Sequence, residues 1–170
     1  VANNIGLLPF NEETIDAYEV GFKTEFNRRI RLNGAAFYNV YKDQLVTLPI
    51  PITGGGSFGN AVVNAGKTNY YGFELEGRWA VMDQFTIDGA LGYVKSDPKD
   101  FPQADINGVN ANAASVFKNG YAPHYTANVG ATYTQEIGAS KLTARVGYNY
   151  TSSFYMFGNP ITSPFSEQTK

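Results

Sequence analysis

The sequence predicts an all-β fold: an antiparallel transmembrane β-barrel segment of about six strands. Three observations predict it. Aromatic residues make up 15% of the 170 residues and charged residues only 16%, whereas about a quarter of a typical soluble domain is charged. Polarity alternates with a period of two residues along six segments. The connections between those segments are alternately short and long, as the periplasmic turns and extracellular loops of outer-membrane barrels are.

The first two segments set the pattern. From Ala17 to Phe26, an apolar face (Tyr18, Val20, Phe22, Phe26) alternates with a polar face (Glu19, Gly21, Lys23, Glu25). The segment from Ile30 to Tyr41 repeats the alternation, although Phe37 and Tyr41 make its second face less polar. Successive side chains of a strand point to opposite faces, so each segment is predicted to be a strand with one apolar face.

The third segment gives the strongest signal. Phe73, Leu75 and Trp79 alternate with Glu74, Glu76 and Arg78, and a dry core could not hold three such charges without extensive pairing. Segments 85–93, 125–133 and 142–150 follow with the same period. A water-filled lumen is therefore expected beside the polar faces, and the predicted lumen-facing charged residues are Glu19, Lys23, Glu25, Glu74, Glu76, Arg78 and Arg145.

Aromatic residues gather near the ends of the apolar faces, where an interfacial girdle would place them. They are Tyr18, Tyr38, Tyr71, Trp79, Tyr93, Tyr125, Tyr133 and Tyr150. Outer-membrane lipid is accordingly the expected partner of the apolar faces.

Composition excludes several classes of protein. The formal net charge of −2 offers no basic surface to a nucleic acid. The absence of cysteine excludes disulfide frameworks, thiolate zinc sites and thiol nucleophiles. The sequence has no run of about 18 apolar residues, which a transmembrane helix would need, and residues 1–10 lack the features of a signal peptide.

Ligand contact, if any, is expected from the two long connections, 47–59 and 96–120, because binding residues are concentrated in loops. Both connections carry aromatic rings beside polar groups, which suits a sugar ring or an aryl chelate, although ordinary loop packing explains them equally well. The candidates are Phe58, Asp97, Asp100, Phe101, Asp105 and Phe117.

No catalytic site, metal site or cofactor is expected. Gly66-Lys67-Thr68 lacks the earlier glycine of a phosphate-binding loop, because position 61 is alanine. Glu74 and Glu76 share a face as a glycosidase pair might, but in a lumen such carboxylates more often hold a plug or shape an entry path. The stretch around Asp105 lacks the last carboxylate of a calcium loop, and loose calcium capture by Asp97, Asp100 and Asp105 stays open. The single histidine, His124, is expected at the girdle or rim.

Four stretches resemble, in order and spacing, the barrel strands of TonB-dependent receptors. Residues 12–23 (EETIDAYEVGFK) are similar to the family's "PET…YELGLK" strand, and residues 32–46 to the strand that follows it. Asn64-Ala65-Gly66-Lys67 with residues 71–76 (YGFELE), and residues 121–128 (YAPHYTAN), resemble two later strands. Together the resemblance covers most of residues 14–155.

The resemblance implies a receptor of the cell outer membrane, without enzymatic activity, that imports a siderophore, vitamin or oligosaccharide. It also implies two partners, a plug domain and the energy-coupling protein TonB. Because no plug sequence and no closing strand are recognised, residues 1–170 are expected to be an internal part of the barrel. A passive porin-like channel and a soluble β-sandwich binding module are the alternatives.

Overall fold

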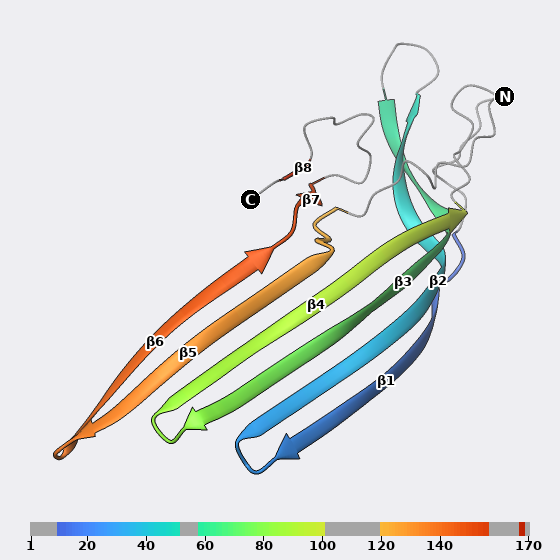
Figure 1. Ribbon diagram of the computed structural model, residues 1–170. Helices are drawn as coiled ribbons and strands as arrows, with labels where there is room; N and C mark the ends of the chain where they lie inside the picture. Colours follow the sequence, from blue (N-terminus) through green and yellow to red (C-terminus); the bar gives the residue numbers. More distant parts are fainter. Residues whose placement is uncertain (1–9, 52–57, 101–119, 157–166, 169–170) are drawn as a thin grey trace.

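The computed structural model describes residues 10–51, 58–100, 120–156 and 167–168, and their main feature is one curved antiparallel sheet (Figure 1). The sheet has six strands, and each strand pairs with the next one along the chain, in the order β1-β2-β3-β4-β5-β6. The predicted all-β fold of about six antiparallel strands is confirmed.

The strands of the sheet are long. They are β1 (Thr14–Phe26), β2 (Ile30–Pro51), β3 (Phe58–Met82), β4 (Phe85–Asp100), β5 (Tyr125–Ile137) and β6 (Ser140–Thr151). Two further strands of two residues each, β7 (Phe154–Tyr155) and β8 (Glu167–Gln168), pair with one another. Among the described residues, no helix is long and apolar enough to cross a membrane.

Three tight turns lie at one end of the sheet, at the lower left of Figure 1, and we call this the short-turn end. In the first, Asn27 and Arg28 have φ values of 50° and 55°, and the Arg29 amide donates to the Phe26 carbonyl at 3.0 Å. The third has Gly138 at φ 60°. Glycine is favoured at the first position of a two-residue hairpin loop because that position takes a positive φ. Arg29 also forms an ion pair with Asp83 at 2.8 Å, so neighbouring turns are tied together.

The opposite end, which we call the long-loop end, differs from the expectation. Residues 47–51, 58–59 and 96–100 were predicted to lie in loops but belong to β2, β3 and β4. The extension of β2 pairs with β3 as far as Pro51 and Phe58. Its sequence has two prolines and no clear alternation, so these strand ends could not be predicted from the pattern of polarity.

The extended hairpin of β2 and β3 has a local irregularity at Asp43. Asp43 takes a left-handed φ of 55°, and the pairs on either side of it are Lys42 with Lys67 and Gln44 with Ala65. The Asn64 side-chain amide donates to the Asp43 carbonyl at 2.7 Å and to the Asn11 carbonyl at 3.1 Å. Its Oδ1 accepts from the Asn11 amide at 2.7 Å. One side chain therefore satisfies backbone groups of two segments where the strand is irregular.

Candidate functional site

The strand register brings like side chains together on each face of the sheet. Phe22, Gly34, Leu75, Leu91 and Ala127 form one continuous row of paired positions. The next row on the other face is Lys23, Asn33, Glu76, Ala90 and Asn128. We call these the apolar face and the polar face.

The apolar face is uncovered. Val20 is 73% exposed, Val146 71% and Tyr148 66%, and the described residues place no second layer over it. A soluble β-sandwich would bury this face against another sheet, so the sandwich alternative does not fit the structure. Exposed apolar surface this extensive marks an interaction with a membrane or a protein.

The apolar face has a constant height. In each of the six strands two apolar or aromatic border residues stand eight positions apart, from Tyr18 to Phe26, Tyr38 to Ile30, Tyr71 to Trp79, Tyr93 to Phe85, Tyr125 to Tyr133 and Tyr150 to Leu142. Eight residues of strand span roughly 27 Å along the strand axis, and a strand tilted by about 30° would carry this stretch across about 23 Å of membrane, comparable with the apolar band of about 25 Å in outer-membrane barrels. The face therefore matches the apolar band of such a barrel.

Neighbouring aromatic rings meet along the border at the long-loop end, which we call the upper border. Tyr38 and Tyr71 stack with ring centroids 6.4 Å apart, and the Tyr93 and Tyr125 centroids are 4.8 Å apart. Tyr18, Tyr38 and Tyr71 share one row of pairs, Tyr93 and Tyr125 share the next, and Tyr150 lies in the one after. The predicted aromatic girdle is thus a stepped line across all six strands.

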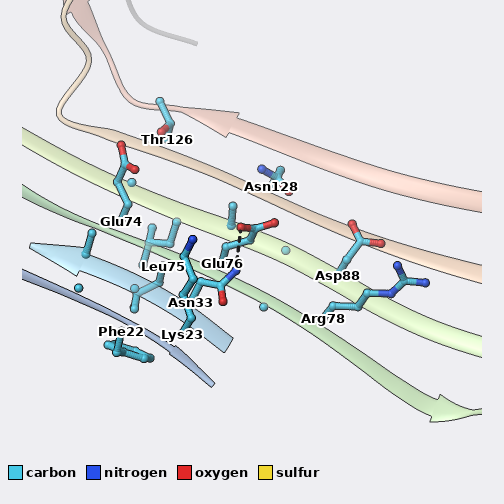
Figure 2. Close-up of a pocket in the computed structure, with 18 of the residues that line it drawn as sticks. Phe22, Lys23, Asn33, Glu74, Leu75, Glu76, Arg78, Asp88, Thr126 and Asn128 are labelled. Atoms are coloured by element: carbon cyan, nitrogen blue, oxygen red, sulfur yellow. Dashed lines mark hydrogen bonds between the residues drawn. The ribbon is translucent and has the colours of Figure 1, made fainter. Parts of the chain in front are cut away.

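The polar face lines an open hollow of about 900 Å³, shown in Figure 2. Glu19, Lys23, Glu74, Glu76 and Arg78 line it together with Asp88 and Asn128. Thr126 and Asn128 come from β5, so the hollow extends across five strands. Such a surface presents charge to water on one side of a sheet whose other side is apolar.

Charges on the polar face are partly paired. Arg31 bonds Glu25 at 3.3 Å, and the Asn33 amide donates to Glu76 at 3.4 Å, drawn as a dashed line in Figure 2. Within the described residues, Glu74 and Arg78 form no ion pair. Glu74 lies close to the middle of the apolar band, and Arg78 lies nearer the short-turn end, across from Asp88 of β4.

The best-formed polar contact crosses two strand intervals. Arg145 of β6 reaches over β5 to grip both oxygens of Asp88 on β4, at 2.6 and 2.7 Å. The same guanidinium donates to Thr132 Oγ1 at 2.8 Å. The contact is possible because Gly130, which lies between, has no side chain: a Cβ there would lie 2.9 Å from Arg145 Cζ and 3.1 Å from Asp88 Oδ2. A bidentate fork of this kind fixes geometry as well as charge.

The seven predicted lumen-facing residues all lie on the polar face. Five line the hollow, Glu25 bonds Arg31 beside them, and Arg145 bonds Asp88. Asp88 was missed as a site residue because its importance depends on a partner 57 positions away. The signal that could have found it is the alternation of β4, in which Asp88 follows the apolar Ile87 and therefore points to the polar face.

The loop candidates fall elsewhere. Asp97, Asp100 and Phe58 belong to strands, which corrects their assignment to loops, and Asp97 forms an ion pair with Lys99 at 2.6 Å. The side chains of Phe58 and Asp100, and all of Phe101, Asp105 and Phe117, lie outside the described residues. The described residues hold no group of three or more His, Cys, Asp or Glu side chains placed to bind a metal.

Two smaller predictions have clear outcomes. His124 stacks on Tyr93 with centroids 6.5 Å apart, and its Nδ1 donates to the Val94 carbonyl at 2.9 Å, so it is a border residue. Gly66-Lys67-Thr68 lies inside β3, and no helix follows it to hold a phosphate.

Comparison with known proteins agrees with this geometry. The sequence matches the family described as "TonB dependent receptor-like, beta-barrel" over residues 1–167. The fold is similar to the ferric yersiniabactin uptake receptor FyuA from Yersinia pestis, with a TM-score of 0.65 and 21% identity over 95% of this chain and 21% of that one. It is also similar to the copper transporter OprC, with a TM-score of 0.62 and 12% identity over 92% of this chain and 20% of that one. No curated protein matches. The chain spans about a fifth of the length of these two structures.

Proposed function

The chain belongs to the TonB-dependent receptor family of outer-membrane proteins, and on that premise we propose that it forms part of a barrel wall through which a scarce ligand is imported with energy delivered by TonB. The passive porin-like channel is the alternative that this proposal sets aside.

The observation that carries the proposal is the sorting of one sheet into two faces. Leu75 and Glu76 are neighbours in β3, yet they belong to rows that are apolar and polar across several strands. A wall between lipid and water requires this arrangement. Hydrocarbon cannot form hydrogen bonds with charged groups, and apolar side chains are less favourable in water than in hydrocarbon.

The proposal includes further strands on both sides. β1 and β6 are the two edges of the sheet, and within the part of the chain that the structure describes no further strand pairs with the outer side of either one. In a bilayer core the backbone groups of a sheet edge are satisfied only when a barrel closes. Residues 1–170 therefore make up one sector of a larger barrel.

A plug domain would meet the polar face of that sector. Glu74 and Arg78 offer a carboxylate and a guanidinium that form no ion pair within the described residues. A plug surface that brings an opposite charge to each would gain charge-assisted hydrogen bonds. We assign Glu19, Lys23 and Glu76, which line the same hollow, to the same contact surface or to the ligand path.

For the ligand, the first class to test is a metal chelate. One similar structure is described as a ferric yersiniabactin uptake receptor and the other as a copper transporter, so both descriptions name a metal. A vitamin or an oligosaccharide is the second class. Contact would come from the long connection that follows β4 and includes Phe101, Asp105 and Phe117, since long surface loops usually carry binding residues.

The test uses the full-length receptor expressed in a strain that lacks its own uptake receptors. The ligand is identified by growth on a panel in which a ferric chelate is the sole source of iron, vitamin B12 the sole source of cobalamin, or an oligosaccharide the sole source of carbon. Removing TonB should then abolish growth on that ligand. Growth that persists without TonB at low ligand concentration would favour the passive channel.

Deletion of residues 101–117 in the same receptor tests the loop. We expect normal surface expression and lost or weakened uptake. Unchanged uptake would show that this connection only covers the barrel mouth.

A further inference from the structure

The polar face carries more positive than negative charge near the short-turn end. One row of paired positions crosses four strands there, and its charged members are Glu25, Arg31, Arg78 and Asp88. Arg145, from the next row, reaches into it to bond Asp88. Three guanidinium groups therefore share two carboxylates. We call Arg31 and Arg78 the arginine pair.

The arginine pair is unfavourable as a structural element. Its two residues are direct partners across β2 and β3, and like charges in such positions destabilise a sheet. Arg31 contacts Glu25 at 3.3 Å, and the two side chains are 65% and 47% exposed, so this ion pair is weak. Arg78 forms no ion pair within the described residues. Stability alone does not account for the arrangement.

One carboxylate could neutralise Arg78, but it is held elsewhere. Asp88 is the direct partner of Arg78 across β3 and β4, and side chains in such positions are close enough to pair. Figure 2 shows the two residues next to one another at one end of the hollow. Arg145 instead takes both oxygens of Asp88 from two strands away, at 2.6 and 2.7 Å, across the space that Gly130 leaves. The fork therefore keeps Asp88 from pairing with Arg78.

We propose that the arginine pair binds an oxyanion group, a carboxylate or a phosphate, of the imported ligand, and that Arg145 is the positioning residue that keeps Arg78 available for it. The inference rests on the proposed function, because it requires that a ligand pass this wall. Arg78 lines the open hollow, which gives such a group access to it. The planar fork of a guanidinium also matches the geometry of both oxyanions.

The same reasoning chooses between the two partners open to Arg78. A carboxylate of the plug would be a fixed partner, and Asp88 in the wall could serve as a fixed partner equally well. A ligand that arrives and leaves requires a guanidinium that is free in between. Holding Asp88 away from Arg78 has a purpose only in the second case.

The first test is a crystal structure of the full-length receptor soaked with selenate, an oxyanion whose selenium atom is located by anomalous scattering. We expect selenate between the guanidinium groups of Arg31 and Arg78. A plug carboxylate bonded to Arg78 in the wild type, or an arginine pair without selenate, would overturn the proposal.

The second test measures selenate affinity by isothermal titration of the full-length receptor and its variants. Arg78→Gln should weaken binding roughly tenfold, because a charge-assisted hydrogen bond is lost. Arg145→Gln should weaken it by a similar factor, because the released Asp88 then pairs with Arg78. Adding Asp88→Asn to Arg145→Gln should restore the affinity, since no carboxylate is left to occupy Arg78. The control is Arg28→Gln, which removes an exposed arginine of the first turn and should bind like the wild type.

The restored affinity separates a positioning role from a merely structural one. An unchanged unfolding midpoint in detergent shows that each variant is folded. If Arg145→Gln misfolds, Gly130→Ala tests the same step, because it displaces the guanidinium of Arg145 from Asp88. Full selenate binding by the folded Arg145→Gln variant, or no recovery in the double variant, would contradict the proposal. Neither test involves TonB or the imported ligand, so failure here is separable from failure of the proposed function.

Discussion

Two glycines, one on each face, show how the same sheet handles lipid and water. On the apolar face, Gly34 lies between its partners Phe22 and Leu75, and a Cβ there would stand 2.5 Å from Phe22 Cε1 and 2.9 Å from Leu75 Cδ2. On the polar face, Gly130 lets Arg145 and Asp88 meet above it. In both places an absent side chain allows two larger ones from different strands to come together.

The contents of the two contacts differ. Above Gly34 the neighbouring groups are the apolar side chains of Phe22 and Leu75, and only lipid could make equally favourable contacts in their place. Above Gly130 they are charged and half exposed, at 54% for Arg145 and 30% for Asp88, so water is an acceptable substitute. The comparison therefore predicts that changes on the apolar face cost more than equivalent changes on the polar face.

The largest effect should come from placing a charge in the apolar face. Leu75→Arg in the full-length receptor should destabilise the folded barrel by ~2 to 4 kcal/mol, because the residue lies near the middle of the apolar band. Its neighbour Glu76→Gln, on the polar face, should have a mild effect. Chemical denaturation in lipid vesicles measures both, and equal losses from the two variants would contradict the assignment of the faces.

A smaller effect should come from overpacking the apolar face. Gly34→Val drives a branched side chain into Phe22 and Leu75 and should cost about 1 to 3 kcal/mol. Gly77→Val is the matched control on the adjacent strand, because the nearest heavy atom to a Cβ there is 3.7 Å away. The control should be neutral or stabilising. A loss at Gly77 as large as at Gly34 would show that strand flexibility, and not packing, decides the outcome.

The smallest effect should come from the equivalent change on the polar face. Gly130→Ala should push the Arg145 guanidinium away from Asp88 at little cost in unfolding midpoint, because the displaced group is the flexible end of an exposed side chain. Gly147→Ala, where the nearest atom is 3.6 Å away, is the control. Raising the salt concentration should remove any difference between the two variants. A difference that survives high salt would mean that the fork is a structural clamp and not a surface ion pair.

The sequence alone predicted the faces better than the strand ends. Alternation placed Leu75 and Glu76 on opposite sides, and the register confirmed it for every strand of the sheet. It could not predict the extensions of β2 and β3 beyond Asp43, since Pro49, Pro51 and the left-handed Asp43 break the period. There the strands depend on backbone pairing and on the Asn64 amide, which joins residues far apart in sequence.

The site divides in the same way. The charged residues of the polar face were predictable because each needs only its own strand's period. The Asp88 and Arg145 contact was not, because it requires the register of three strands and a glycine at the one position where they cross.

The stepped upper border has a geometric consequence. From β1 to β6 it drops by four residues, from the row of Tyr18 to the row of Tyr150, over five strand intervals. With a rise of about 3.3 Å per residue and strands about 4.8 Å apart, a flat membrane crossing this border requires the strands to tilt by roughly 29°, somewhat below the usual range for outer-membrane barrels. Strands so inclined each occupy about 5.5 Å of circumference. These six would supply roughly 33 Å of perimeter, so the width of the pore depends mainly on strands beyond this sector.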